Sequence, residues 1–420
     1  MSPGVDPGPS RGRPTFEVTS SSFGEQHAAV RPWRDVRVLR VVTQVVVLLL
    51  VGVGIGFLAN NLQSAMAERN LTFGYGFLDQ RAGFEIGDSP VPYSASDTYG
   101  QAFLVGLLNT VFLSVVGIVL ATVLGLVLGV ARLSPNWLLA RVVGGYIELI
   151  RNTPLLLQLF VIYFVVLVQL PPVEDSLSMA GAVFLNQRGL FVPSPQLSST
   201  FVVWVAIIVA ATALALAGRA LGARREIVRL RNAGRGGWLN RHAGLVGAIA
   251  VVGLAVAAWV LLPQDPMGFD LPVAGRFNFS GGLALSTAFT AILVGLVLYT
   301  AAFIAEVIRG GIQAVRRGQV EAAHALGLSD GDTLRLVVFP QAMRIIVPPL
   351  TSQYLNLAKN SSLAIAVGYP DLFKVGTTMA NQTGQPIPVI ALVMGTYLAI
   401  SLATSLLMNL YNRRVQVLER

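Results

Sequence analysis

The functional pattern that stands out in this chain is a polar stretch, residues 318–340, between two long apolar segments. From Glu321 it reads Glu-Ala-Ala-His-Ala-Leu-Gly-Leu. The small side chains of Ala322 and Ala323 allow another protein to approach the backbone closely, and Gly327 is expected to end a short helix. The pattern indicates a protein-docking loop, although an amphipathic hairpin on the membrane surface would have the same spacing.

The sequence shows no group that could hydrolyse ATP or hold a metal. A P-loop places its Lys directly after Gly, whereas the only two lysines, Lys359 and Lys374, follow Ala and Phe. The three histidines lie in separate segments and cysteine is absent, so neither metal-ligand spacing nor a disulfide is predicted. We therefore expect no catalytic residue, no metal and no cofactor, and energy must come from a partner subunit or an ion gradient.

A second polar group lies inside an apolar segment near the C-terminus. Asn356, Lys359 and Asn360 recur at helical spacing, and Ser361 follows them. A Lys near the bilayer centre costs about 2.5–3.5 kcal/mol, so these side chains must face protein or water. The pattern predicts either part of a translocation path or a structural hydrogen-bond network between helices.

Two carboxylate–arginine pairs lie near the ends of apolar segments. Glu148 with Arg151, and Glu306 with Arg309, are each three residues apart and so share a helix face. We predict that both are structural ion pairs, because a local partner lowers the cost of placing a charge near the membrane.

The elements that must position these residues are membrane-spanning helices. Hydrophobic residues make up 54% of the chain and charged residues 12%, and segments of about twenty apolar residues can cross a bilayer. We predict an all-α integral membrane protein with about eight spans, at residues 38–58, 101–131, 146–170, 197–217, 243–262, 283–305, 345–368 and 388–411. No soluble enzyme domain is predicted.

Arginine predicts the orientation of these spans, because cytoplasmic loops collect basic residues. With both termini in the cytoplasm, the translocated loops receive only Arg69, Arg81, Arg188, Arg276 and Lys374. The net charge of +9 is spread over loops that flank the membrane, so no nucleic-acid partner is expected. The Arg-rich loop at 219–241 is interpreted as an orientation signal, with binding of anionic membrane lipid as the alternative.

Several segments in the same order resemble one family of transporters. They are Asn109-Thr110, residues 146–154, residues 299–318, the stretch from Glu321 to Pro340, and Lys359-Asn360-Ser361-Ser362-Leu363. Together they resemble ABC importer permeases of the polar amino acid family. Residues 73–78 and 99–110, with the larger number of spans, are most similar to the Q-type permease of bacterial general L-amino-acid transport systems.

The resemblance implies a five-helix type I importer core that is interrupted by an insertion. The implied parts are a disordered cytoplasmic N-terminus (1–37), an added helix (38–58), a periplasmic segment (59–100), core helices 1–2 (101–170), an insertion with two helices (171–282), core helices 3–5 (283–412) and a cytoplasmic C-terminus (413–420). Within the last core part, residues 318–340 would be the cytoplasmic EAA coupling loop.

The function implied is that of a pore-forming subunit of an ATP-driven importer in the bacterial inner membrane, which translocates L-amino acids by alternating access. Its implied partners are two cytoplasmic ATPase subunits, a second homologous permease and a periplasmic amino-acid-binding protein. Glu321, Ala322, Ala323, Gly327 and Pro340 would form the ATPase-coupling loop. The alternative is a secondary transporter driven by an ion gradient, and amino-acid specificity stays open.

Overall fold

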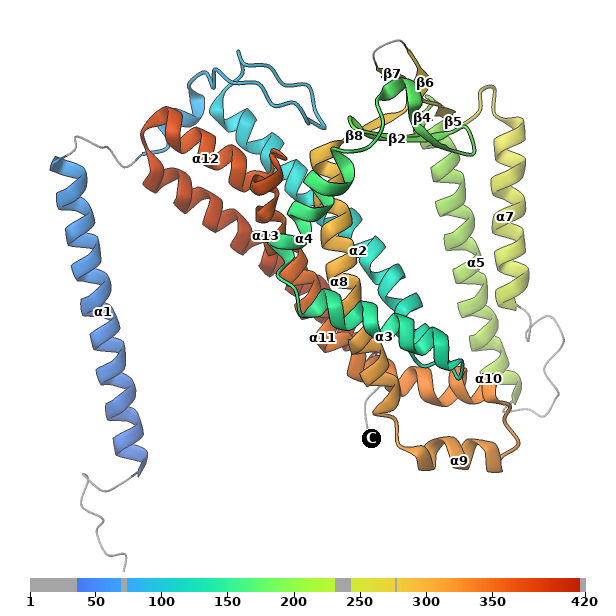
Figure 1. Cartoon of the computed structure of the whole chain (residues 1–420). Helices are drawn as coiled ribbons and strands as arrows, with labels where there is room; N and C mark the ends of the chain where they lie inside the picture. The colour runs from blue at the N-terminus through green and yellow to red at the C-terminus, as the bar shows by residue number, and fades with distance from the viewer. Residues whose placement is uncertain (1–35, 69–73, 231–242, 276–277, 416–420) are drawn as a thin grey trace, which may run out of the picture. The chain divides into compact units, whose positions relative to one another are not determined.

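The computed structural model describes residues 36–68, 74–230, 243–275 and 278–415, and these residues are mostly helical (Figure 1). The chain divides into two compact units, residues 1–72 and 73–420. The described part of the first unit is helix α1 (Val36–Glu68), whose apolar segment Leu39–Asn61 matches the first predicted span. Residues 1–35 of the predicted N-terminal tail lie outside the described residues.

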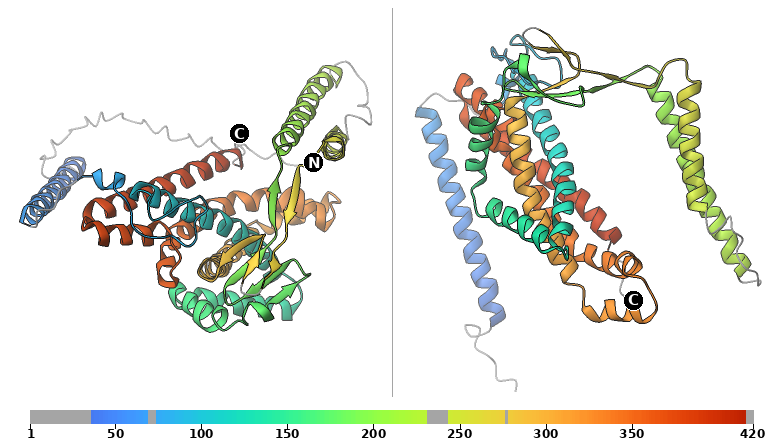
Figure 2. Two further views of the ribbon diagram at one scale, coloured as in Figure 1. Left: turned by 90° about the horizontal axis from the view of Figure 1, so that it is seen from above. Right: turned by 45° about the vertical axis from the view of Figure 1, so that its right-hand side comes forward.

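Two long helices, α2 (Tyr99–Arg132) and α8 (Thr287–Gln313), pack along each other in the second unit (Figures 1 and 2). Glycines on α2 make this approach possible. A Cβ atom at Gly125 would lie 2.6 Å from Ile304 Cγ2, and one at Gly129 would lie 2.9 Å from the carbonyl oxygen of Ala305. The Gly-x-x-x-Gly spacing therefore brings the α2 backbone against α8, as small residues do between membrane helices.

The predicted span over 146–170 is interrupted by a sharp bend. Helix α3 (Trp137–Arg151) ends before Pro154, and α4 (Leu155–Phe160) continues into the π-helical segment η3 (Val161–Leu167), with a bend of 105° between the two parts. The cause is local, since the residue before proline is driven out of the helical region and proline has no N–H to donate.

The chain after α8 forms a loop and then three further helices. The elements are α9 (Arg317–Ala325), α10 (Asp330–Thr333), the π-helical segment η5 (Leu334–Val338), α11 (Phe339–Asn360), the 3-10 helix η6 (Ser361–Val367), α12 (Leu372–Thr383) and α13 (Pro386–Val415). The predicted span over 345–368 differs, because α11 starts earlier and becomes a 3-10 helix at Ser361. Helix α11 carries several polar side chains and is not one of the helices that are apolar enough to cross a membrane.

Residues 177–286 contain short antiparallel strands that the sequence did not predict. One sheet has the order β1 (Leu177–Met179), β2 (Val183–Asn186), β3 (Gly189–Val192), β8 (Leu283–Ser286), and two pairs join β4 (Ser194–Leu197) with β5 (Met267–Asp270) and β6 (Val273–Ala274) with β7 (Phe279–Ser280). Strands β4 and β8 occupy the predicted starts of the spans at 197 and 283, so those helices begin later.

Helices α5 (Phe201–Leu230) and α7 (Ala243–Leu261) of the insertion lie side by side (Figure 2). Trp204 Nε1 donates to the carbonyl oxygen of Ala255 at 2.9 Å, and its ring meets Trp259 edge to face. Residues 231–242 of the predicted Arg-rich loop lie outside the described residues.

Five helices in the described ranges are long and apolar enough to cross a membrane, or six if the bent pair α3 and α4–η3 counts as one span. This is fewer than the eight predicted. The differences lie at the bend after Arg151, at the polar α11, and at α7, whose described apolar segment, Gly247–Leu261, is short.

Candidate functional site

The loop between α8 and α11, residues 314–338, starts with the short helix α9. This helix ends in a Schellman motif, in which Gly327 N–H donates to His324 O at 2.9 Å and Leu328 N–H donates to Ala323 O at 3.2 Å. Gly327 has φ +78°, in the left-handed region that glycine favours. The predicted helix end at Gly327 is therefore observed, with a geometry that requires glycine.

The predicted loop residues face different ways. Glu321 and Ala322 are exposed, whereas Ala323 is buried against the rest of the chain, so only Ala322 offers its small side chain to a partner. Pro340 is exposed in the first turn of α11. Ser329 caps α10 by accepting from Asp332 N–H at 3.2 Å.

Apolar side chains surround this short helix on the molecular surface. Leu326 is 83% exposed, directly before the left-handed turn, and Leu334, Leu336 and Phe339 are more than half exposed as well. His324 Nε2 lies 3.1 Å from Asp330 Oδ1 and ties α9 to α10. The α8–α11 loop therefore presents a braced helix with an exposed apolar edge, which is the form of a surface that binds another protein.

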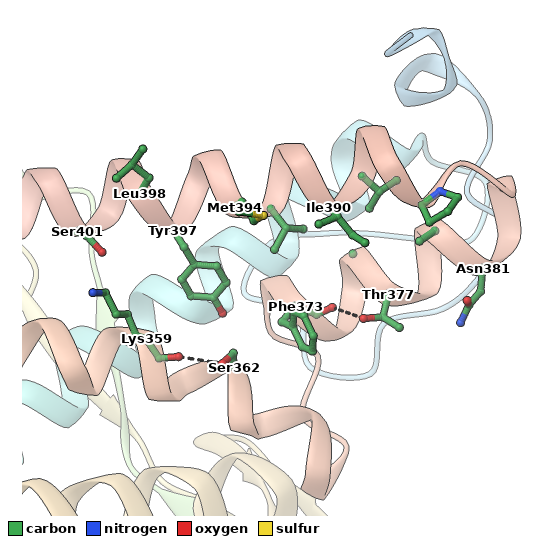
Figure 3. A pocket seen from close by; sticks show the side chains of 15 residues that line it. Lys359, Ser362, Phe373, Thr377, Asn381, Ile390, Met394, Tyr397, Leu398 and Ser401 are labelled. Atoms are coloured by element: carbon green, nitrogen blue, oxygen red, sulfur yellow. Dashed lines mark hydrogen bonds between the residues drawn. The ribbon is translucent and has the colours of Figure 1, made fainter. Parts of the chain in front are cut away.

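A cavity of about 580 Å³ lies among α11, η6, α12 and α13 (Figure 3). Its polar side chains are Lys359, Ser362, Thr377, Asn381, Tyr397 and Ser401, and the rest of the lining is mainly apolar. Ser362 Oγ donates to the carbonyl oxygen of Lys359 at 2.9 Å. A few polar groups in an apolar wall are typical of sites that take small organic molecules.

The four residues predicted for the translocation path are divided by the structure. Lys359 lines the cavity, and Asn356 is exposed on α11 but is absent from the cavity wall. Asn360 is half-buried, while Ser361 is fully buried and donates to Ala358 O at 2.8 Å. Ser361 therefore satisfies the backbone where α11 ends.

One of the two predicted ion pairs, Glu306 with Arg309, is observed. The other, Glu148 with Arg151, is not among the ion pairs of the described residues, because Glu148 joins a network between α2, α3 and α8. Arg309 Nε donates to both carboxylate oxygens of Glu306, at 3.1 and 3.2 Å. Glu148 instead pairs with Arg132, whose Nη2 lies 3.5 Å from Glu148 Oε1 and whose Nη1 lies 3.7 Å from Glu306 Oε2. Arg151 lies over the ring of Phe303, with its Cζ 5.2 Å from the ring centroid.

A buried polar group joins α2, α12 and α13. Asp371 caps α12 by accepting from Lys374 N–H at 2.9 Å, and Tyr397 Oη donates to its other oxygen at 3.0 Å. Thr110 Oγ1 accepts from Leu372 N–H at 2.9 Å. Burial raises the pKa of the Asp371 carboxyl to about 6. Sequence reasoning missed Asp371, although a Pro-Asp pair before a helix indicates an N-cap.

The apolar helices, the exposed loop and the cavity together define a polytopic membrane protein. Residues 244–419 match the family of binding-protein-dependent transport system inner membrane components. The chain is 46% identical to the putative amino-acid ABC transporter permease protein YhdX of Escherichia coli (strain K12), over 89% of this chain and 93% of that protein. It belongs to the ABC transporter permease family.

Other relatives also match over most of their length. The general L-amino acid transport system permease protein AapQ of Rhizobium johnstonii is 43% identical, over 89% of this chain and 91% of its own. The glutamate/glutamine/aspartate/asparagine transport system permease protein BztB of Rhodobacter capsulatus is 40% identical, over 92% and 96%. A solved structure of an amino acid ABC transporter with histidines aligns at 22% identity and TM-score 0.44, over 75% of this chain and 95% of that one.

Proposed function

We propose that this permease carries L-amino acids, polar ones among them, across the bacterial inner membrane by alternating access. Its relatives that match over most of their length support this cargo class, since each is named as a permease for amino acids. The cavity beside Lys359 supports a path of the right kind, because an ammonium and hydroxyl groups in an apolar wall suit a small polar molecule. Asn356 and Asn360 are proposed to meet the cargo only as it moves along α11.

The observation that carries the proposal is the α8–α11 loop. Its short helix ends at a glycine in the left-handed region, and beside that turn lies Leu326, an apolar side chain left in the open. Such a leucine is costly in water and favourable in a protein groove. We infer that Glu321, Ala322, Gly327 and Pro340 contribute the polar, small and turn-forming parts of the surface that binds an ATPase subunit, with Ala323 supporting it from inside.

We further propose that this chain works with two ATPase subunits, a second homologous permease and a periplasmic amino-acid-binding protein. ATP would be hydrolysed by the separate subunits, because the two lysines of this chain lack a P-loop context. The positive-inside rule supports cytoplasmic termini and a cytoplasmic α8–α11 loop, which carries Arg316, Arg317 and Arg335. We also propose that residues 101–170 and 283–412 form the permease core and that residues 171–282 are an insertion in it.

The test is co-purification of the ATPase subunit with tagged permease from its native membrane. With Leu326→Asp or Gly327→Val, the amount of ATPase that co-purifies is expected to fall at least about tenfold. That factor corresponds to a loss of about 1.4 kcal/mol of docking free energy. Leu177→Asp is the matched control, since Leu177 is also an exposed leucine but lies on β1 of the insertion.

Equal recovery of the ATPase with Leu326→Asp, Gly327→Val and the control would contradict the docking assignment. Membrane insertion of all variants is checked first by their yield and elution in detergent, so that a folding defect is recognised. A variant that inserts normally and loses the ATPase supports the proposal.

A further inference from the structure

A second cavity, of about 300 Å³, lies where the segment before α2 meets β8 and η6. Its polar lining groups are Asp88, Ser89, Asn109, Ser286 and Tyr369. Its volume is at the lower end of the range for small-molecule sites, which is about 300–1,000 Å³.

The cavity contains a carboxylate whose charge has no cationic partner in the described part of the chain. Asp88 Oδ2 accepts a hydrogen bond from Ser286 Oγ at 2.6 Å, and the ion pairs of the described residues do not include Asp88. Burial raises the pKa of the Asp88 carboxyl, and the Ser286 hydrogen bond opposes that effect. A half-buried anion of this kind is stabilised by any cation that enters beside it.

Aromatic rings form the wall near this carboxylate. Phe112 stacks on Phe289 with ring centroids 5.5 Å apart, and Phe289 meets Tyr369 at 5.4 Å. Ring faces attract ammonium groups. Burial, and then the charges of Asp88 and Asp371, raise the pKa of Tyr369.

Hydrogen bonds from α2 fix the two loop segments beside the cavity. Asn109 Nδ2 donates to the carbonyl oxygens of Asp88 at 2.7 Å and of Pro370 at 2.9 Å. Ser286 also caps α8, since it accepts from Phe289 N–H at 3.0 Å. The carboxylate is therefore positioned on a rigid part of the fold.

The cavity and the α8–α11 loop lie at opposite ends of α8. Helix α8 runs from β8 to the α8–α11 loop (Figure 1). Its first turn lines the cavity with Phe289, and its 27 residues span about 40 Å. If the loop lies in the cytoplasm, the cavity lies at the outer end of the core.

We propose that this cavity is an entry site that binds the ammonium group of an incoming amino acid through Asp88 and the rings of Phe112 and Tyr369. The inference rests on the proposed function for its cargo. A phosphatidylethanolamine headgroup carries the same primary ammonium, so the test must separate these two sources.

The absence of cysteine allows a single reporter thiol. Ser89→Cys places one in the cavity wall of the purified transporter, and its labelling is measured on this subunit after gel separation. Cationic methanethiosulfonate reagent is expected to react several-fold faster than the neutral one. In Asp88→Asn, which keeps an acceptor for Ser286, the ratio of the two labelling rates should fall to the ratio measured for a free thiol in solution. In the matched control Asp79→Asn the ratio should not change, because Asp79 is an exposed carboxylate outside the cavity.

Protection by ligand is measured in vesicles of phosphatidylcholine and phosphatidylglycerol. Millimolar L-glutamine should slow the labelling of the thiol several-fold, whereas the analogue of glutamine that lacks the α-amino group should not slow it. Phe112→Leu should weaken this protection by glutamine. Equal reagent rates, or protection by both compounds, would overturn the site. Protection that appears only when phosphatidylethanolamine is added would overturn the assignment to cargo.

ATP hydrolysis by the unmodified complex in the same preparation tests the importer assignment separately. If hydrolysis responds to the amino-acid-binding protein and the reporter thiol of the Ser89→Cys variant shows no charge preference, the entry site fails and the proposed function stands.

Discussion

Lys359 is the side chain whose charge gives the clearest consequence for cargo. Its ammonium lies in the wall of the cavity among α11, α12 and α13 (Figure 3). A charge near a carboxylate at an effective dielectric of about 20 contributes a few kcal/mol at close range and less when solvated. Lys359 would therefore favour acidic cargo as it passes.

Replacement of Lys359 by Gln is expected to lower glutamate uptake several-fold more than arginine uptake, because the change removes a positive charge and retains a polar side chain. The measurement is competitive uptake of the two labelled amino acids by vesicles that contain the complete complex. Lys374→Gln is the matched control, since Lys374 lies outside the cavity wall. An unchanged ratio in Lys359→Gln would remove Lys359 from the path.

Asp371 gives a prediction for stability against pH. Its pKa of about 6 in the folded chain lies above the ordinary 3.8, so between these values the folded state binds more protons than the unfolded state. Its contribution to stability is fully present below about pH 4 and is lost as the pH rises through 6, by roughly 3 kcal/mol at most.

The Tm of the detergent-solubilised protein should therefore fall between pH 4 and 7 by less in Asp371→Asn than in the unchanged chain. Asn keeps the cap of α12 through its one amide oxygen, and its NH2 group can donate to Tyr397 Oη in place of the hydrogen bond that Asp371 accepts. Parallel Tm curves for the two proteins would show that Asp371 titrates normally.

Residue types in a local pattern were predictable from the sequence, and partners distant in the chain were not. The turn at Gly327 and the Glu306–Arg309 pair follow from spacing of a few residues, and both are observed. The link that Arg132 makes between Glu148 and Glu306 was not predicted, because that contact depends on how α2, α3 and α8 pack.

At the scale of elements, the packing of α2 against α8 depends on glycine. A side chain at Gly129 would meet the backbone carbonyl of Ala305, which cannot move aside as a side chain can. The two helices would have to separate, with a loss of at least about 1–3 kcal/mol, the usual cost of overpacking.

Gly129→Leu is therefore expected to lower the Tm by several degrees and to increase proteolysis of the core. Gly145→Leu serves as the control, because Gly145 lies on α3 with open space at its Cβ position. Equal Tm values for both variants would show that the close contact of α2 and α8 does not contribute to stability.

Helix existence was predictable, and helix ends were less so. Apolar runs indicated α2, α8 and α13 because hydropathy over twenty residues is a strong signal. The bend after Arg151 was missed because the apolar run continues across Pro154, and composition hides a break in geometry. The strands β1 to β8 are two to four residues long, too short for an alternating pattern to be recognised.

At the scale of the whole molecule, the α8–α11 loop and the cavities belong to one helical scaffold. Helix α8 leads directly into α9, and α11 leads from the loop to Lys359. Movement of the loop by a bound ATPase would therefore act on the cavity wall through α11, as a rigid element transmits a shift between two sites. We propose that this connection is how ATP hydrolysis by a separate subunit would drive transport through this chain.

Uptake by vesicles that contain the complete complex tests this claim most directly. With the amino-acid-binding protein outside, ATP inside and no ion gradient, labelled glutamine should accumulate, and Gly327→Val should abolish accumulation while the control Gly331→Val, whose site has open space and no left-handed φ, retains it. Accumulation that needs an ion gradient and ignores ATP would contradict the account.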